Sequence, residues 1–533
     1  MSLFGDISDH IRYTLSVAKY LRHTTTLEQS RRTAEKQLAE REANFLITME
    51  RAVYAYPSNP YRRMLQHAGY ELEDLRRLVG EVGLEATLDQ LYDAGVYVTQ
   101  DELKGRQPIR RDGLEIAVKQ TDFDNPLIGR ADWESKSSGS TGEPNRVRGN
   151  FESRESRVMT HLVQEAVSRG RPMAYWTYSG LHRAITTAKR GVAYEKCYRT
   201  TPYGFNGETY RIVSAFVVGN LMGRKIPWPH YVPRDQAVKI ARWLAEKTAA
   251  GTPAVMSSHA SPAIRICLAA RNAGLDISGT LFRVGGEPFT SGKEAVVKSV
   301  GATASVGYTT IELGSPVASG CGTPASVDDM HLITDRLAMI HRPRQLATGE
   351  TMSAMIFTSL MPKASKLLLN WESADCAIIE ERQCGCMLGD MGFTTHISDV
   401  QSYEKLTSEG VTFSASLLYH LVEEVLPARF GGQLGDYQLV EEEEDGLPRV
   451  RIVVSPRVGP VDEAAVIAVV MENLESSHEG AGGKEMTDQW RQGETLQVVR
   501  REPEVTRTQK VAPLRVRSRD GAREERVPAG ADD

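Results

Sequence analysis

The sequence has few cysteines, little net charge and no long apolar run. Six cysteines among 533 residues, unevenly spread, are too few for a disulfide framework and indicate a reducing compartment. A formal net charge of −5 provides no positive field for DNA or RNA, so we expect no nucleic-acid partner. No stretch has the length that spans a bilayer, and Asp6, Asp9 and Arg12 interrupt any signal-peptide core. We therefore expect a cytoplasmic protein without a membrane span.

What the sequence does contain is typical of a globular protein with several domains. Its composition is 41% hydrophobic and 25% charged, and 533 residues exceed what one hydrophobic core holds. The first part is helical in pattern, because charged and apolar residues recur at three-and-four spacing in Thr26–Tyr54 and Glu71–Tyr92. The Asn59-Pro60 turn separates these two stretches.

Farther along, apolar and helical runs alternate. The alternation begins after the helical pattern of Glu152–Ser168. It predicts βαβ units and a mostly parallel sheet. In open α/β sheets ligands bind at the carboxyl ends of strands, so the loops there are the first candidates for a site. The apolar runs are Ile212–Leu221, Ala254–Met256, Gly279–Val284 and Ala302–Tyr308, and the helical runs are Asp235–Lys247, Pro262–Ala273 and Lys293–Ser299.

Between these regions lies a polar stretch, Ser137–Arg146, that contains neither a strand nor a helix pattern. Hydroxyl side chains and two glycines offer donors that phosphate oxygens accept, which favours a phosphate-binding loop. It is not a Walker A loop, since no Gly-Lys-Ser/Thr closes it. A plain flexible Ser/Gly linker has the same composition and stays open as an alternative.

The same stretch resembles the Ser-Ser-Gly-Thr-Thr-Gly-x-Pro-Lys signature of adenylate-forming enzymes, in particular the phenylacetate-CoA ligase-like branch of acyl- and aryl-CoA ligases. Asn145 stands at the position of the signature lysine, with Arg146 beside it. The resemblance implies ATP binding by Ser137, Ser138, Gly139, Ser140, Thr141 and Gly142.

Two later loops resemble the family in the expected order. One is Gly285–Pro288, where the resemblance implies that Gly286 and Glu287 line the adenine. The other is Tyr308–Glu312, where the resemblance implies an ATP-binding turn that includes Thr309. In this turn the Tyr308 ring would stack on adenine, and Glu312 would be a catalytic ligand of Mg²⁺. Thr309 replaces the family's Gly, and Ile311 replaces its hydroxyl residue. Ordinary turns at strand ends are the alternative.

The segment 349–375 resembles the family strand that ends in a ribose-binding Asp. Asp375 takes that position, with Ala374 where the family has Gly and Asn370 near its Arg-Tyr pair. A carboxylate accepts two donors at once, which suits the two ribose hydroxyls. A surface Asp at a strand end is the alternative.

Cysteines and a histidine in this region suggest a metal site. Cys384-Gly385-Cys386 places two thiols on one turn, and an earlier Cys and His complete a Cys₃His set of the structural-zinc type. Some members of the resembled group bind zinc at similar places. The predicted ligands are Cys321, His331, Cys384 and Cys386, with Cys376 as a rival and buried reduced thiols as the alternative.

The C-terminal part predicts a small α+β domain. Helix Ser414–Leu426, strands Tyr437–Glu441 and Arg449–Val454 and helix Val461–Asn473 are expected, with the acidic run Glu441–Asp445 as a solvated hairpin tip. The resemblance implies a hinge at Asp399–Leu406, which is poorly matched here. It also implies a thiol-acceptor loop containing Gly410 and an adenylation lysine, for which the nearest match is Lys510; a tail lysine is the alternative.

Together these features predict an α/β protein with a helical N-terminal extension and a smaller, mobile C-terminal domain. The expected boundaries are a helical region 1–112, an AMP-binding domain 113–398, a small domain 399–516 and a disordered tail 517–533. The implied activity is ATP-dependent adenylation of a carboxylic acid, then transfer to a thiol of coenzyme A or a carrier protein, with Mg²⁺ and structural Zn²⁺. A nucleotide-binding relative without ligase activity and an interaction protein working through its N-terminal helices are the alternatives.

Overall fold

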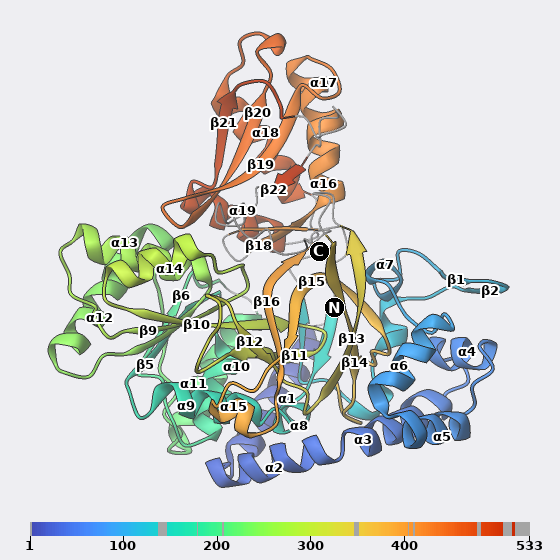
Figure 1. Cartoon of the computed structure of the whole chain (residues 1–533). Helices are drawn as coiled ribbons and strands as arrows, with labels where there is room; N and C mark the ends of the chain where they lie inside the picture. The colour runs from blue at the N-terminus through green and yellow to red at the C-terminus, as the bar shows by residue number, and fades with distance from the viewer. Residues whose placement is uncertain are drawn as a thin grey trace, which may run out of the picture.

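The structure, a computed structural model, has a large domain with a smaller domain above it (Figure 1). It describes residues 3–136, 146–178, 180–204, 207–345, 351–402, 405–408, 411–476, 481–504 and 514–516. No helix within these ranges combines the length and the apolar character needed to cross a membrane.

The N-terminal helices pack against the large domain. Phe45 and Leu88 belong to the same buried core as the large sheet. Polar caps fix where the helices begin: the Thr26 hydroxyl accepts from the Gln29 N–H, and the Asn59 side chain accepts from the Tyr61 N–H. The helices are α1 (Leu3–Leu21), α2 (Leu27–Ala39), α3 (Arg41–Thr48), the π-helical turn η1 (Met49–Tyr54), α4 (Pro60–His67), α5 (Leu72–Val82), α6 (Leu84–Asp93) and α7 (Gln100–Leu103).

A mixed sheet is the centre of the large domain, and its first half is parallel. The strand order across the sheet is β13-β14-β15-β16-β12-β11-β10-β9-β8-β5-β6-β7. All neighbouring pairs from β7 to β10 are parallel, which confirms the βαβ units predicted from the alternating runs. These strands are β5 (Met173–Thr177), β6 (Lys196–Arg199), β7 (Pro229–Tyr231), β8 (Val255–Ser258), β9 (Leu281–Gly285) and β10 (Thr303–Thr310).

The second half of the sheet is antiparallel, and the sequence analysis did not separate it from the first. Every pair from β10 to β13 in the strand order runs antiparallel. These strands are β11 (Gly314–Gly320), β12 (Met330–Leu332), β13 (Leu337–Gln345), β14 (Thr351–Ser359), β15 (Trp371–Glu381) and β16 (Thr395–Ser402). The predicted α/β class is confirmed.

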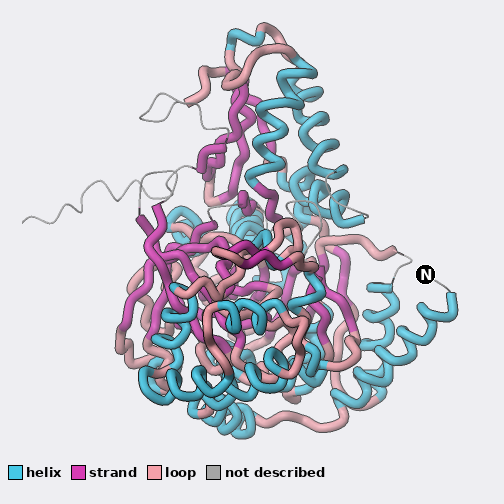
Figure 2. The backbone as a smooth tube through the Cα atoms, turned by 90° about the vertical axis from the view of Figure 1, so that its right-hand side faces the viewer, coloured by secondary structure: helices cyan, strands magenta, loops and turns pink. Residues whose placement is uncertain are grey.

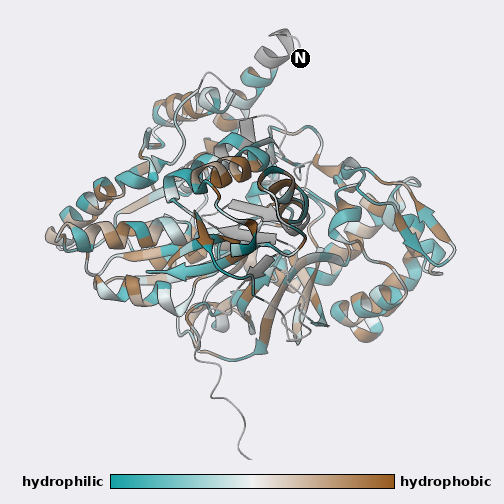
Figure 3. Cartoon of the chain, turned by 90° about the horizontal axis from the view of Figure 1, so that it is seen from above, coloured by the Kyte–Doolittle hydropathy of each residue, from teal (hydrophilic) through white to brown (hydrophobic). Residues whose placement is uncertain are grey.

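Helices cover the sheet, and most carry both polar and apolar residues (Figure 3). They are α8 (Phe151–Glu155), α9 (Met159–Ser168), α10 (Leu181–Lys189), α11 (Gly207–Leu221), α12 (Val238–Ala249), α13 (Ala260–Asn272), α14 (Ser291–Ser299) and α15 (Met387–Asp390), with 3₁₀ turns η2 (Gln120–Phe123), η3 (Pro126–Ile128) and η4 (Arg234–Gln236). Two-stranded ribbons are formed by β1 (Ile109–Arg111) with β2 (Leu114–Ile116), β3 (Trp133–Lys136) with β4 (Arg146–Gly149), and β17 (Lys405–Ser408) with β18 (Val411–Ser414).

One apolar run forms a helix where the alternation predicted a strand. Residues Ile212–Leu221 were expected to form a strand and instead belong to α11. Ile212, Ala215 and Gly219 are buried at helical spacing, and Thr14 of α1 donates to the Ser214 hydroxyl at 3.1 Å. A ten-residue apolar run fits a buried helix as well as a strand, so packing against α1 decides the outcome.

The small domain has its own core and the predicted order of elements. Leu439, Val470 and Trp490 are buried in it. Its helices line one side of a four-stranded sheet of order β21-β20-β19-β22 (Figure 2). The elements are α16 (Ala415–His420), the π-helical turn η5 (Leu421–Val425), α17 (Leu426–Phe430), β19 (Tyr437–Glu444), β20 (Leu447–Val454), the 3₁₀ turn η6 (Pro456–Val458), α18 (Glu463–Ser476), α19 (Ala481–Gly493), β21 (Leu496–Arg500) and β22 (Leu514–Val516).

The acidic hairpin tip of the small domain is not wholly solvated, contrary to the prediction. The Thr290 hydroxyl is 2.8 Å from both carboxylate oxygens of Glu443. Gly446 lies against Val296 of α14, and Leu447 is buried in the core of the large domain. The prediction considered only charge, whereas the apolar residues that follow the acidic run dock on the large domain.

Candidate active site

Three consecutive parallel strands end at the candidate site. His259 follows β8, Gly286 and Glu287 follow β9, and Tyr308 lies near the end of β10. Because these strands are parallel neighbours, their carboxyl ends meet at one edge of the sheet, where α/β proteins bind ligands.

Close backbone packing at this edge requires glycine. A Cβ at Gly285 would lie 2.4 Å from the Gly307 carbonyl oxygen on the neighbouring strand. Gly286 has φ +77°, and a Cβ there would lie 2.7 Å from the His259 ring. The sequence identified Gly286 by resemblance, whereas nothing in the sequence marked His259, because a lone histidine carries no pattern.

Glu287 is held by the helix that follows β8. Its carboxylate accepts from the Ser261 backbone N–H at 3.1 Å and from the Ser261 hydroxyl. The side chain is buried at the N-terminus of α13, where a carboxylate interacts favourably with the helix dipole. Glu287 therefore fixes the loop after β9 to α13, and its role toward adenine stays a prediction.

Tyr308 and Asp375 lie together although 67 residues separate them in sequence. The Tyr308 hydroxyl donates to Asp375 Oδ2 at 2.6 Å. Burial raises the pKa of Tyr308 well above its ordinary value, and the Asp375 and Glu312 carboxylates raise it further. The phenol is thus a neutral donor at physiological pH. The structure brings together two residues that the resemblance assigned to the adenine and the ribose of one nucleotide.

A β-bulge places Glu312 beside this pair. The register of β10 against β11 shifts between Tyr308 and Thr310, and such bulges redirect the side chains that follow. The Thr310 hydroxyl accepts from the Leu313 N–H at 3.2 Å, closing the turn that holds Glu312. Glu312 is buried, whereas Thr309 is exposed on its strand.

Asp375 also lies at an irregularity of its strand. Ala374 has φ +63°, the left-handed conformation that favours glycine, and the register of β15 shifts in this segment. The resembled family has Gly at this position. The backbone conformation is therefore compatible with the family pattern even though Ala occupies it.

Several predicted site residues lie outside the described residues. These are Gly410, Lys510 and the loop residues Ser137, Ser138, Gly139, Ser140, Thr141 and Gly142, and the predicted tail 517–533 lies outside them too. Their roles stay predictions.

The four predicted metal ligands lie close together at another edge of the antiparallel half. His331 Nε2 lies 3.1 Å from Cys386 Sγ and 3.5 Å from Cys384 Sγ. Cys321 belongs to a group of ligand atoms, with His331, Cys384 and His396, that all lie within 4.8 Å of one another. Thiol sulfurs and an imidazole nitrogen at such spacing are the donors that zinc prefers.

A hydrogen bond holds the His331 imidazole in the form that a metal needs. His331 Nδ1 lies 2.6 Å from the Phe393 carbonyl oxygen, so Nδ1 is the donor and Nε2 carries the lone pair. His396 Nδ1 lies 2.7 Å from Asp329 Oδ1 and 3.0 Å from Arg382 Nη2, and its buried Nε2 has no hydrogen-bond partner among the described residues. His396 was missed by the sequence analysis because its place beside the cysteines depends on the pairing of β12 with β16.

The thiols of this cluster differ in acidity. Burial raises the pKa of Cys321 to about 11. Burial also acts upward on Cys384, but hydrogen bonds from the Cys386 N–H and thiol and from Cys321 outweigh it and lower the pKa to about 7. These hydrogen bonds favour the Cys384 thiolate, the form that coordinates a metal.

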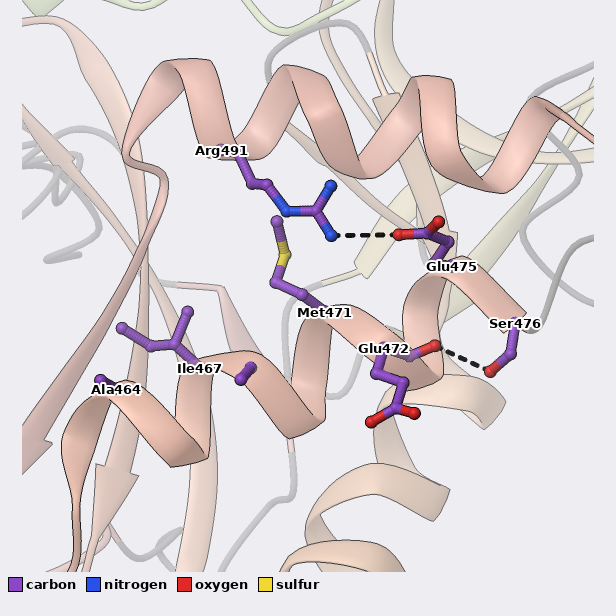
Figure 4. Close-up of a pocket in the computed structure, with 8 residues that line it drawn as sticks. Ala464, Ile467, Met471, Glu472, Glu475, Ser476 and Arg491 are labelled. Atoms are coloured by element: carbon purple, nitrogen blue, oxygen red, sulfur yellow. Dashed lines mark hydrogen bonds and ion pairs between the residues drawn. The ribbon is translucent and has the colours of Figure 1, made fainter.

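An apolar groove on the small domain has different chemistry. It lies between α18 and α19, with Met471 at its centre and the Arg491–Glu475 ion pair of 3.0 Å on one side (Figure 4). Its lining combines apolar side chains with this ion pair, Glu472 and Ser476, and it includes none of the predicted site residues.

Comparisons with known proteins gave similarity in structure alone. No protein-family model and no curated protein matches the chain. The chain is similar to o-succinylbenzoate-CoA synthetase from Bacillus subtilis with a bound product analogue, at 9% identity and TM-score 0.39 over 72% of this chain and 68% of that one. It is similar to PA1221, a protein with adenylation and PCP domains, at 11% identity and TM-score 0.34 over 83% and 90%.

A third similar structure is an acyl-CoA synthetase (AMP-forming)/AMP-acid ligase II-like protein from Dyadobacter fermentans. The identity is 11% and the TM-score 0.28, over 71% of this chain and 87% of that one. All three TM-scores lie below 0.5.

Proposed function

We propose that the protein is an adenylate-forming enzyme that activates a carboxylic acid with ATP and passes the acyl group to a thiol, with coenzyme A as the favoured acceptor. The observation that carries the proposal is the Tyr308–Asp375 hydrogen bond at the carboxyl end of the parallel strands, with Glu312 in the adjoining turn. Tyr308 and Glu312, from one motif of the resembled family, thus lie beside Asp375, from another.

Each group has a role that suits its chemistry. The Tyr308 ring offers a face for adenine, and Asp375 accepts from the ribose hydroxyls. Glu312 would hold Mg²⁺, which neutralises charge on the phosphates when bound. The loop Ser137–Gly142 is the predicted cradle for the phosphates, and Lys510 is the predicted cation that stabilises charge as it develops.

The reaction has two steps. A carboxylate oxygen of the acid attacks the α-phosphorus of ATP, and the bond to the bridging oxygen breaks so that pyrophosphate leaves with the electron pair. The thiol sulfur then attacks the acyl carbon, AMP leaves, and the thiol proton is released. Because negative charge shifts onto phosphate oxygens in the first step, positioning and electrostatic stabilisation supply most of the catalysis.

A structural metal ion accompanies this function in our proposal. Cys321, His331 and Cys384 would hold zinc together with Cys386, as the resemblance implies, and His396 supplies a further donor in the same cluster. The ion would tie the turn after β15 to β11 and β12, strands that lie between β10 and β15 in the sheet.

Pyrophosphate exchange tests the proposal. The full chain should incorporate labelled pyrophosphate into ATP when its acid is present, and Glu312→Gln should reduce the rate strongly. If ATP binds but no acid supports exchange, the chain is a nucleotide-binding protein without ligase activity. If ATP neither binds nor raises the unfolding temperature, the interaction-protein alternative takes its place.

A further inference from the structure

Two helices of the large domain, α1 and α11, carry an exposed apolar face. The helices pack against each other, and the N-terminal end of α1 lies at the outer edge of the domain (Figure 2). Of the fifteen large apolar residues that are exposed in the described part of the chain, six lie on or directly after these two helices. They form what we call the α1–α11 face, which consists of Ile11, Leu15, Val213, Val217, Leu221 and Met222.

Contacts between α1 and α11 hold the two helices in a fixed, parallel arrangement. His10 stacks on Tyr210 with 4.1 Å between the ring centroids, and the hydroxyls of Thr14 and Ser214 lie 3.1 Å apart. Because the residue numbers of the contacting pairs rise together, the helices run in the same direction. The α1–α11 face is therefore formed by two helices that are already positioned relative to each other.

The apolar residues of both helices point to the same outward side. Ile11 and Leu15 lie one position after the α1 residues that contact α11, whereas Val213 lies one position before Ser214. Successive residues of an α-helix are turned by about 100°. In a parallel pair, one step forward on α1 and one step back on α11 therefore lead to the same side. Leu15 is 65% exposed there.

The sequence of α11 indicates that its outward side also needs a cover. Ile212 and Ala215 are buried against the domain, whereas Val213 and Val217 are exposed. A helix that is apolar on all sides is typically buried on all sides, and α11 has only one side covered by its own chain. The apolar run that sequence patterns assigned to a strand thus supplies a second apolar surface.

The size of the α1–α11 face matches the apolar part of a homodimer interface. With about 170 Å² for a fully exposed aliphatic residue, exposed fractions of 37% to 83% give the six residues roughly 550 Å² of accessible surface. A standard interface buries about 800 Å² on each partner, and about 65% of a homodimer interface is apolar. The face therefore has the apolar area that one partner of a stable dimer contributes.

We propose that the α1–α11 face is the interface of a two-fold symmetric homodimer, in which it packs on the same face of a second copy of this chain. The helix pairs of the two copies then form a four-helix layer. Aliphatic residues four positions apart, such as Ile11 and Leu15 or Val213 and Val217, form the ridges that such packing uses.

The charges at one end of the face select the direction of this packing. Lys19 lies in the last turn of α1, and the exposed Arg22 directly follows the helix. Lys225 is exposed shortly after α11. Parallel packing of two copies would bring these cations together, whereas antiparallel packing places them at opposite ends. The dimer is therefore antiparallel across the interface.

The composition of the face favours a protein partner over a lipid surface. Its members are Ile, Leu, Val and Met, the residues that pack between helices. Helices that lie on a membrane commonly add Trp or Phe to the apolar face and carry Lys and Arg along its length. Lys19, Arg22 and Lys225 instead gather at one end.

Sedimentation of the full chain at micromolar concentration tests the proposal. Wild type should sediment as a dimer, with twice the monomer mass of 59.0 kDa. Leu15→Glu and Leu221→Glu should raise the dimer Kd about 100-fold or more, because two-fold symmetry places each new charge in the interface twice. Leu434→Glu is the matched control: Leu434 of the small domain is 75% exposed, against 83% for Leu221, and this variant should dimerise as wild type does.

Circular dichroism of the variants shows whether each monomer keeps its fold, which is expected because the replaced leucines are exposed. A wild-type chain that stays monomeric would refute the dimer. A dimer that persists in both Leu15→Glu and Leu221→Glu would place the contact elsewhere and refute this face. Co-sedimentation of a monomeric wild type with phosphatidylglycerol vesicles, lost in Leu221→Glu, would assign the face to lipid and overturn the proposal.

Discussion

Replacing Asp375 with Asn should weaken ATP binding by a predictable amount. Asp375 accepts one hydrogen bond from Tyr308, and a carboxylate has further lone pairs for ribose hydroxyls. Asn keeps one acceptor oxygen, so the Tyr308 bond can persist while at least one charge-assisted ribose bond is lost. Such a bond contributes about 1.5–3 kcal/mol, and since about 1.4 kcal/mol is tenfold in Kd, the Kd for ATP should rise about 10-fold to 140-fold.

Calorimetric titration of MgATP at neutral pH measures this change. Glu380→Gln is the matched control, because Glu380 is an exposed acid on the same strand and the charge change is identical. Glu380→Gln should bind ATP as the wild type does. If Asp375→Asn also keeps wild-type affinity, with an unchanged unfolding temperature, then Asp375 does not hold the ribose and the nucleotide site has been placed wrongly.

Three further predictions concern the metal, the second domain and pH. Cys384→Ser should lose the zinc that the purified wild-type protein contains, as measured by elemental analysis, and zinc-free wild-type protein would contradict the site. Lys510→Ala should slow pyrophosphate exchange strongly with little change in ATP affinity, and exchange at the wild-type rate in this variant would remove the lysine from the mechanism. Gly410→Ala should impair thioester formation more than adenylation. Burial raises the pKa of Asp335 from 3.8 to about 6, so the folded state favours the protonated carboxyl. The stability that this protonated group provides is complete below about pH 4 and is lost as the pH rises through 6. Wild type should therefore lose about 3 kcal/mol of unfolding free energy relative to Asp335→Asn between pH 4 and 7, and parallel pH profiles in denaturant would contradict this.

Local patterns were sufficient for the parts of the fold that depend on neighbouring residues. Strands β8, β9 and β10 and the helices between them lie close to the predicted runs, because alternating apolar strands and amphipathic helices have distinct periods. The main elements of the small domain were predicted for the same reason. The spacing of Cys384-Gly385-Cys386 pointed to the region where Cys384 lies near Cys321 and His331, and metal binding there stays a prediction.

Features that depend on long-range packing were not predictable. His396 becomes a candidate metal ligand through the β12–β16 pairing. The docking of Leu447 on the large domain likewise depends on how two domains meet. A single sequence carries no period or motif for such contacts, so the residues that complete the candidate site appear only in three dimensions.

Acid-dependent pyrophosphate exchange is the most direct test of the central claim. The full chain is incubated with MgATP, labelled pyrophosphate and a panel of aryl, aliphatic and dicarboxylic acids, with Glu312→Gln as the paired control. Our account predicts label in ATP for at least one acid and strongly reduced label in Glu312→Gln. Absence of exchange with every acid, in protein that binds ATP, would contradict it.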